Sequence, residues 1–347
     1  MYFFDTSMIS VLLPIRNAAA TLPDALESLL AQTYGDFEVL CLDDGSDDHL
    51  MGQGSRHILE RYARRDNRLR PVFLTHGGIV HALNLGLDLA QGEYVARMDA
   101  DDVSHPRRLE LQAAYLRERP DVGLAACRAA FGGESERARG YKRHLDWTNG
   151  LLSHEQMALG RFRESPLVHP TVMFRRTVVQ RYGGYRAGPF PEDYELWLRW
   201  LEAGMRMAKL PDVLYTWNDP PARLSRTHPR YSTAAFYRTK ARYLAKWLKA
   251  NNPFHPRVLV MGAGRITRRR AELLLEHGVE ITAWADIDPR KIGRTVAGRK
   301  VFHRDDIPAP GRVFILSYVA GHGAAEDIAA FLDKRGYTQG RNYVLAA

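Results

Sequence analysis

The stretch YVARMDADD, residues 94–102, places three acidic residues directly after a short apolar segment. That segment predicts a buried strand, which ends where Asp99 begins. In an extended chain the side chains of residues i and i+2 point to the same side. We therefore expect Asp99 and Asp101 to face a common ligand while Asp102 points elsewhere. An acidic cap for a helix ahead of Pro106 is the alternative.

The alternation of short strands and helices extends through the first hundred residues. We expect strands at 9–14, 37–42, 72–74 and 94–98, separated by helices through 22–30, 58–62 and 82–87. Such repeated units indicate an α/β fold with a mostly parallel sheet and helices on both faces. Ligands of open α/β sheets bind at the carboxyl ends of the strands. The residues that we expect to converge at that edge are Asp43, Asp44, Asp99 and Asp101.

A second series of strands and helices follows the turn-rich segment Asn251-Asn252-Pro253. It predicts a small Rossmann-like α/β domain at 253–347, joined to residues 1–228 by a basic amphipathic helical linker at 229–252. Within it, Gly262-Ala263-Gly264 and the later Asp286 resemble part of a dinucleotide-binding fingerprint, although Thr267 replaces the third glycine. A nucleotide site, a structural role and a homodimer contact all remain open for this domain.

Composition and charge restrict the class of protein. The chain has 347 residues, of which 45% are hydrophobic and 26% charged, as in ordinary globular proteins. A formal net charge of +9 favours polyanionic partners. No signature of a common nucleic-acid-binding module is present, so we expect no nucleic-acid partner. Cys41 and Cys127 each lie in an apolar segment, which predicts core thiols and no disulfide framework.

The N-terminal residues Met1–Asp5 lack the basic and apolar regions of a signal peptide, and no segment is long and apolar enough to span a membrane. We therefore expect a cytoplasmic protein. The basic amphipathic segment 231–249 leaves open a peripheral contact with the inner face of the membrane. Packing of this segment against a neighbouring domain is the alternative.

Five sequence elements occur in the order and spacing of one known family. They are Pro14-Ile15-Arg16-Asn17, Asp43-Asp44-Gly45-Ser46, the series Gly78, Ala82, Asn84 and Gly86, Asp99-Ala100-Asp101, and Glu192-Asp193. In these elements the chain resembles glycosyltransferase family 2 over about residues 8–230. The resemblance implies a GT-A nucleotide-sugar-binding domain at 1–228 that transfers a sugar, with inversion, to a hydroxyl of a saccharide or lipid-linked acceptor.

On the donor side, the resemblance implies that Asp43 or Asp44 binds the uracil and ribose of a UDP-sugar. A simple turn at Asp-Gly-Ser is the alternative. Arg16 stands where relatives often carry an aromatic or acidic residue, which leaves the base preference open. The other residues that we expect to bind substrate are Pro14, Asn17, Gly78, Asn84, Asp99, Glu192, Trp197 and Arg223.

A hard divalent cation held by one or two carboxylates is the usual way to neutralise a nucleotide diphosphate. We therefore expect Asp99 and Asp101 to hold Mg²⁺ or Mn²⁺, with His228 as a third candidate ligand. The basic stretch from Arg223 to His228 would close over the diphosphate as a lid.

On the acceptor side, Asp193 matches the catalytic base of the family, which takes the proton of the attacking hydroxyl. Acidic residues also favour the first turn of a helix for electrostatic reasons alone. Trp197, one turn later, either stacks on the acceptor sugar or packs in the core, and His169-Pro170 should lie near the acceptor. Two other functions stay open: a nicotinamide-dependent oxidoreductase that uses the C-terminal domain, and a non-catalytic nucleotide-sugar-binding protein.

Overall fold

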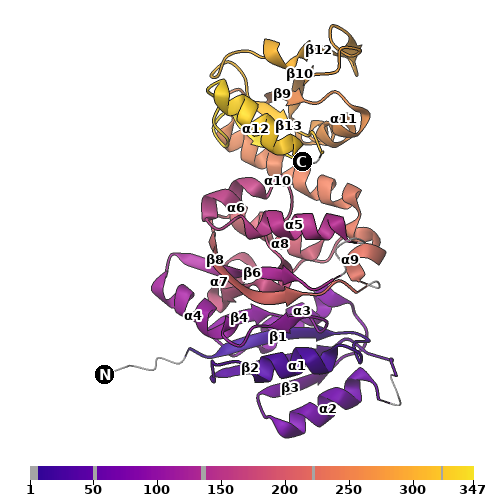
Figure 1. The fold of residues 1–347 in the computed structure, drawn as a ribbon, viewed down its shortest axis with the longest axis vertical. Helices are drawn as coiled ribbons and strands as arrows, with labels where there is room; N and C mark the ends of the chain where they lie inside the picture. The colour runs from indigo at the N-terminus through magenta and orange to yellow at the C-terminus, as the bar shows by residue number, and fades with distance from the viewer. Residues whose placement is uncertain (1–6, 50–52, 134–137, 221–222, 322) are drawn as a thin grey trace. The chain divides into compact units, whose positions relative to one another are not determined.

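The computed structural model describes residues 7–49, 53–133, 138–220, 223–321 and 323–347 (Figure 1). Met1–Asp5, on which the prediction about a signal peptide rests, lie outside the described residues. By its contacts the chain forms two compact units. The first contains Met1–Met157, Pro166–Gly188 and Glu195–His228, and the second contains Ala158–Ser165, Pro189–Tyr194 and Pro229–Ala347.

The first unit is built on an eight-stranded sheet in the order β3-β2-β1-β4-β7-β6-β8-β5. The four strands β3, β2, β1 and β4 are parallel, as the sequence predicts, whereas β7 runs antiparallel to both of its neighbours. The strands are β1 (Ile9–Ile15), β2 (Phe37–Asp43), β3 (Leu69–Phe73), β4 (Tyr94–Arg97), β5 (Val103–Ser104), β6 (Val122–Phe131), β7 (Met173–Arg175) and β8 (Arg206–Trp217).

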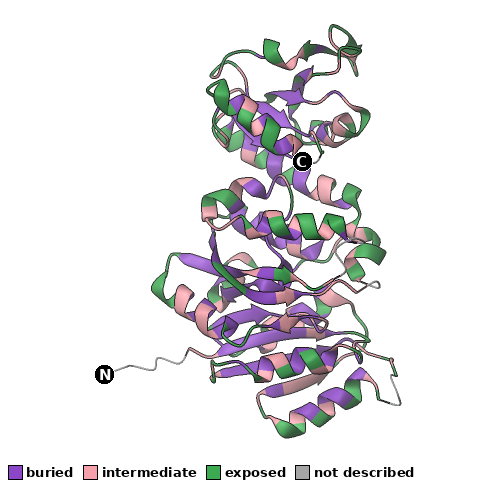
Figure 2. Ribbon diagram, in the orientation of Figure 1, coloured by how far each residue is buried: buried purple, intermediate pink, exposed green. Residues whose placement is uncertain are grey.

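Helices cover both faces of the parallel strands. Alternate residues of β1, such as Val11 and Leu13, join a core with α1 (Leu22–Leu30), α2 (Ser55–Arg65), α4 (Arg108–Glu118) and α5 (Arg139–Asn149). Leu12 points to the opposite face, where α3 (Ile79–Leu89) packs so closely that a Cβ atom at Gly86 would come within 2.6 Å of Leu42. Gly86 therefore allows α3 to lie directly on the sheet, and Figure 2 shows the strands of this unit mostly buried.

The remaining helices of the chain before residue 232 are short. They are α6 (His154–Gly160), α7 (Arg176–Tyr182), α8 (Glu192–Glu202), α9 (Leu224–Thr227), and the 3₁₀ turns η1 (His169–Thr171) and η2 (Pro229–Tyr231). The turn η1 lies just before β7, which pairs with β4 on one side and β6 on the other.

The second unit contains a Rossmann-like sheet in the order β11-β12-β10-β9-β13-β14, whose last five strands are parallel. Its elements are α10 (Thr233–Asn251), β9 (Arg257–Met261), α11 (Arg265–Glu272), η3 (Leu275–His277), β10 (Glu280–Asp286), β11 (Thr295–Val296), β12 (Arg299–His303), η4 (Arg304–Asp306), β13 (Ile315–Ser317), α12 (Ala324–Lys334) and β14 (Tyr343–Leu345). The connections on either side of β12 carry no α-helix, so this unit is smaller than a full dinucleotide-binding domain.

The apolar face of α10 is buried inside the second unit. Leu244 and Leu248 are fully buried, and the Trp247 ring packs on Phe162 and Phe314 with centroid distances of 5.6 and 6.1 Å. The apolar face of α10 therefore packs within its own unit, which was the alternative to a membrane contact. The membrane contact itself stays a prediction. Among the described residues, no helix is both long and apolar enough to cross a bilayer.

Cys41, Cys127 and Lys209 are buried inside the first unit. Cys41 and Cys127 are free thiols in β2 and β6, and burial raises the pKa of Cys41 to about 12. Lys209 of β8 is 4% exposed and donates to the backbone carbonyls of Thr148 and Pro166. Burial lowers the pKa of Lys209 to about 7, because the ammonium group loses its hydration inside the fold.

The Lys209 site makes the stability of the fold depend on pH. An unfolded lysine has a pKa of about 10.4, so between pH 7 and pH 10 the unfolded state binds more protons here than the folded state. The free energy of unfolding should therefore rise by about 1 kcal/mol per pH unit between pH 7.5 and 9.5, relative to Lys209→Met, in urea titrations. Lys142→Met, at an exposed lysine, is the control, and parallel curves for wild type and Lys209→Met would contradict the prediction.

Candidate active site

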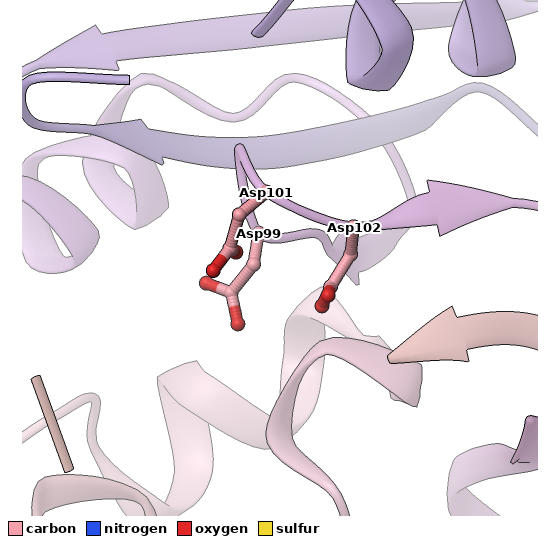
Figure 3. A group of neighbouring side chains, drawn as sticks. All are labelled: Asp99, Asp101 and Asp102. Atoms are coloured by element: carbon pink, nitrogen blue, oxygen red, sulfur yellow. The ribbon is translucent and has the colours of Figure 1, made fainter. Parts of the chain in front are cut away.

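A reverse turn after β4 gathers the acidic residues. The N–H of Asp102 donates to the carbonyl of Asp99 at 3.3 Å, which closes a four-residue turn. One carboxylate oxygen from each of Asp99, Asp101 and Asp102 lies within 4.8 Å of the others. Figure 3 shows the three side chains extending to the same side of the turn. The prediction that Asp102 points elsewhere is wrong, because it assumed an extended chain.

The end of β8 holds this turn in place. The Tyr215 hydroxyl accepts the N–H of Asp99 at 3.2 Å. Asn218 donates twice, from its side chain to the carbonyl of Asp101 at 2.6 Å and from its backbone to Oδ1 of Asp102 at 2.7 Å. Sequence reasoning did not identify Tyr215 or Asn218, since both lie more than a hundred residues after the turn.

Burial and mutual repulsion dominate the electrostatics of the three carboxylates. Burial and the Asp99 carboxylate raise the pKa of Asp101 to about 6, and burial raises the pKa of Asp102 well above its usual range. Two arginines oppose this effect. Arg97 lies 2.5 Å from Oδ1 of Asp99, and the Arg223 guanidinium lowers the pKa of Asp101 and Asp102.

The donor set fits a hard divalent cation. Three carboxylate oxygens in one small group are ligands that Mg²⁺ and Mn²⁺ prefer, and thiol or imidazole ligands are not part of the group. His228, predicted as a third ligand, is exposed at the end of α9 and does not belong to this group of described residues. The turn brings Asp102 back toward Asp99, and a role of His228 as a cation ligand stays a prediction.

Asp44 and Gly78, two predicted donor-binding residues, contact each other. The Asp44 carboxylate accepts the N–H groups of Gly77 at 2.7 Å and Gly78 at 2.9 Å, and the His76 ring lies 2.8 Å from it. Gly78 has a φ of 84°, which a residue with a side chain rarely adopts. Asp44 therefore supports the glycine turn in this structure, and its contact with a base stays a prediction.

Asn17 and Asp43 stabilise the adjoining loops. Asn17 donates from Nδ2 to Asp47 at 2.8 Å and accepts the Asp47 N–H at 2.9 Å. Asp43 is 3% exposed and accepts the N–H of Ser46 at 3.0 Å, so the turn expected at Asp-Gly-Ser is present. Pro14 is half-buried near the carboxyl end of β1. These residues line up along one edge of the sheet, as the sequence predicts.

Asn84 holds a distant loop. Its Nδ2 donates to the carbonyl of Tyr185 at 3.0 Å, and its Oδ1 accepts the N–H of Tyr185 at 2.9 Å. Both hydrogen-bonding groups of the amide are thus used within the chain. Asn84 therefore holds the loop at Tyr185, which local reasoning did not identify because it lies a hundred residues away, and its contact with substrate stays a prediction.

The acidic pair at the start of α8 divides into two environments. Glu192 is 2% exposed, the Tyr231 hydroxyl lies 2.8 and 2.7 Å from its two oxygens, and Arg230 lies 3.8 Å away. Glu192 is therefore buried and held by Tyr231, and its contact with substrate stays a prediction. Asp193 is half-buried and accepts the N–H of Tyr194 at 2.7 Å.

Asp193 and its neighbour Glu192 belong to the second unit, whereas Asp99 and Asp101 belong to the first. The convergence of Asp193 with the acidic turn therefore stays a prediction.

Trp197 and His169 lie in the core of the first unit. Trp197 is fully buried, with its ring edge-on to His169 at 5.8 Å and to Trp200 at 5.6 Å. Stacking of Trp197 on an acceptor sugar is wrong for this structure, and the core-packing alternative holds. His169 lies 2.8 Å from the Tyr185 hydroxyl, and burial together with the charge of Arg97 lowers the pKa of His169 well below its usual value.

The basic stretch after β8 is packed against aromatic rings. The Arg223 guanidinium lies 4.0 Å from the centroid of Trp217, and that of Arg226 lies 4.6 Å from the centroid of Tyr141. Arg226 also pairs with Asp219. Arg223 thus faces the acidic turn from an ordered position, and the opening or closing of this stretch as a lid stays a prediction.

In the second unit, polar groups of the partial dinucleotide fingerprint bond to other residues of the same unit. Asp286 accepts the N–H of Ala263 at 2.7 Å and an ion pair from Lys291 at 3.2 Å. At the adjoining end of β13, the Tyr318 ring packs on Tyr237 of α10 at 6.2 Å. The carboxylate that would bind a ribose is therefore already engaged, which gives the oxidoreductase alternative no support.

Comparison with known proteins places this geometry in context. The family described as Glycosyl transferase family 2 matches residues 10–183, half of the chain. The O-antigen biosynthesis glycosyltransferase WbnJ of Escherichia coli is 30% identical over 246 residues, which cover 70% of this chain and 89% of that protein. The amylovoran biosynthesis glycosyltransferase AmsE of Erwinia amylovora is 32% identical over 213 residues, or 60% and 74% of the two chains.

Among solved structures, TarS 1–349 from S. aureus in complex with UDP-GlcNAc aligns with a TM-score of 0.53 and 19% identity. The alignment covers 77% of this chain and 78% of that chain, and it shows a common fold. The sheet and the acidic turn at its carboxyl edge therefore define a glycosyltransferase with the GT-A fold. The chain belongs to glycosyltransferase family 2.

The two roles considered for Asn84 differ in what its removal does to stability. Asn84→Ala removes two hydrogen bonds to the Tyr185 backbone, so we expect the free energy of unfolding in urea to fall by about 2 kcal/mol. Asn251→Ala, at an exposed helical asparagine with one hydrogen bond, should change it by less than about 0.5 kcal/mol. An unchanged free energy in Asn84→Ala, together with weaker donor binding, would instead favour the predicted substrate contact.

Proposed function

We propose that this glycosyltransferase moves a sugar from a nucleoside-diphosphate sugar to a hydroxyl of a saccharide or lipid-linked acceptor, with inversion at the anomeric carbon. The observation that carries the proposal is the group of three carboxylates, Asp99, Asp101 and Asp102, at the carboxyl edge of the sheet. A cluster of this kind suits the diphosphate end of a donor only when a divalent cation separates the like charges.

Asp99 and Asp101 hold Mg²⁺ or Mn²⁺ in this proposal, and the buried Asp102, bonded by Asn218, supports the turn beside them. The bound cation would neutralise charge that develops on the leaving diphosphate as the glycosidic bond breaks. Arg223 adds a second positive charge beside the group, and its place over Trp217 limits its freedom to turn away. Tyr215 and Asn218 keep the turn in one conformation, so little reorganisation is needed on binding.

Asp193 acts as the base. It accepts the proton of the acceptor hydroxyl while that oxygen forms a bond to the anomeric carbon and the bond from that carbon to the diphosphate breaks. A direct displacement of this kind inverts the configuration. The environment supports the assignment to Asp193, because Glu192 is buried and held by Tyr231, whereas Asp193 is half-buried.

The names of the relatives suggest the class of acceptor. WbnJ is an O-antigen and AmsE an amylovoran biosynthesis enzyme, and both products are bacterial polysaccharides. A growing glycan chain is therefore the acceptor that we propose. For the donor, UDP-sugars are favoured by the sequence resemblance, and the TarS structure contains UDP-GlcNAc in a protein of the same fold.

Substitution in the acidic turn should separate donor binding from folding. A panel of UDP- and GDP-sugars with Mn²⁺ is first screened by thermal shift, and the best ligand is then titrated by calorimetry. Asp101→Asn should weaken this cation-dependent binding by about a hundredfold or more, because it removes a charged ligand. Asp88→Asn, at an exposed carboxylate of α3, should bind as wild type does. Undiminished donor binding by Asp101→Asn would refute the cation site.

Substitution of the base should have the opposite pattern. Asp193→Asn keeps the size and the acceptor oxygen toward Tyr194 but cannot take a proton, so kcat should fall by about a thousandfold while donor affinity stays within twofold. Glu202→Gln, an exposed acidic residue at the far end of the same helix, is the control. Transfer at a rate near that of wild type by Asp193→Asn would assign the base to another residue.

A further inference from the structure

Arg97, the last residue of β4, and Arg108 of α4 are both buried, but their guanidinium groups have different partners. Arg108 is 0% exposed, and its guanidinium donates to the Gln112 side chain at 3.0 Å and to the carbonyl of Arg97 at 2.7 Å. Arg97 is 1% exposed, and neither its Nε nor its Nη1 has a well-aligned hydrogen-bond partner among the described residues. The strong contact of Arg97 is the ion pair of Nη1 with Asp99 at 2.5 Å.

Burial of a guanidinium group with so few hydrogen bonds is unfavourable for the fold. An apolar side chain at this position of a central strand would cost less, and Arg108 already supplies the polar support that the end of β4 needs. Besides Asp99, the charged groups that act on Arg97 are the Asp101 carboxylate, whose pKa Arg97 lowers, and the Arg108 guanidinium, while burial and Arg97 together lower the pKa of His169. The charge of Arg97 is therefore directed at the acidic turn.

Burial keeps most of the Arg97 guanidinium away from solvent. Its Nε and Nη1 are inaccessible, so a ligand at the carboxylates would meet Asp99 and Asp101 first. The ion pair with Asp99, whose side chain is 25% exposed, is the direct link between Arg97 and a ligand at the turn, and the charge of Arg97 also lowers the pKa of Asp101. The Asp99 carboxylate is one of the predicted cation ligands.

We propose that Arg97 is a positioning residue that occupies Asp99 in the cation-free protein and competes with the divalent cation for that carboxylate. This inference rests on the proposed function of the acidic turn. Because the guanidinium cannot leave the core, its positive charge stays beside the cation and weakens binding of the cation alone. The diphosphate of the donor supplies the negative charge that compensates, so Arg97 makes retention of the cation depend on the donor.

The test measures binding of Mn²⁺ alone, from the electron paramagnetic resonance signal of the free ion. Arg97→Met should bind Mn²⁺ at least about tenfold more tightly than wild type, because the competing charge is gone. Arg97→Lys, which keeps the charge, should stay within about threefold of wild type. Arg97→Gln repeats the comparison if the Met variant does not fold. A purely structural role predicts lower stability in all three variants with unchanged or weaker Mn²⁺ affinity, and that result would overturn the inference.

A double-mutant cycle with Asp99→Asn shows whether the effect passes through Asp99. In the Asp99→Asn background, Arg97→Met should change the Mn²⁺ affinity by less than about twofold, and a persisting tenfold gain would overturn the inference. The same four proteins are unfolded in urea with EDTA, where coupling between the two positions is expected and its absence counts against the ion pair. If Arg97→Met binds Mn²⁺ about tenfold more tightly than wild type but neither protein binds any UDP- or GDP-sugar of the panel with Mn²⁺, the proposed function fails while the inference that Arg97 competes for Asp99 survives.

Discussion

The arrangement of the candidate site in the first unit depends on keeping three carboxylates close together. Like charges within 4.8 Å of one another repel strongly in a partly buried site, so the turn at 99–102 would open unless other groups held it. Tyr215 and Asn218 hold its backbone from β8, Arg97 lies beneath it, and Arg223 faces it from the side. Tyr215 and Asn218 reach the turn through the strands β7, β6 and β8, which complete the sheet beyond β4. β8 begins more than a hundred residues after the turn.

In both acidic pairs, one carboxylate is buried and its neighbour is half-exposed. In the pair Asp101-Asp102 the second carboxylate is buried and bonded to Asn218, and in the pair Glu192-Asp193 the first is buried and held by Tyr231. In each pair the other member stays half-exposed and available to a ligand. Asn218 replaces water at Oδ1 of Asp102, and Tyr231 replaces it at both oxygens of Glu192, so each buried carboxylate is fixed beside its neighbour. In each pair, the buried residue therefore supports the local structure, and its neighbour can contact a ligand.

The second unit carries part of a dinucleotide-binding motif whose polar groups bond to one another. A glycine turn after β9 and an acidic residue after β10 are present in the order that dinucleotide-binding folds use. Their hydrogen-bonding groups, however, satisfy each other: Asp286 binds the backbone of the glycine turn and Lys291, and Tyr237 of α10 packs on the ring that follows β13. The unit therefore has the topology of a nucleotide-binding domain, while its polar groups are used for its own stability and for holding α10.

The sequence alone determined the features that depend on local pattern. Periodicity and turn residues located the parallel strands and their helices, and the motif order identified the family, because both are properties of short segments read along the chain. Tertiary structure decided what each polar group contacts. Asn84 binds the backbone of Tyr185, Trp197 is buried among aromatic rings, and Asp102 lies beside Asp99. These outcomes depend on residues a hundred positions apart that meet only when the sheet is complete, and hydrogen-bond partners at such separation leave no trace in local spacing.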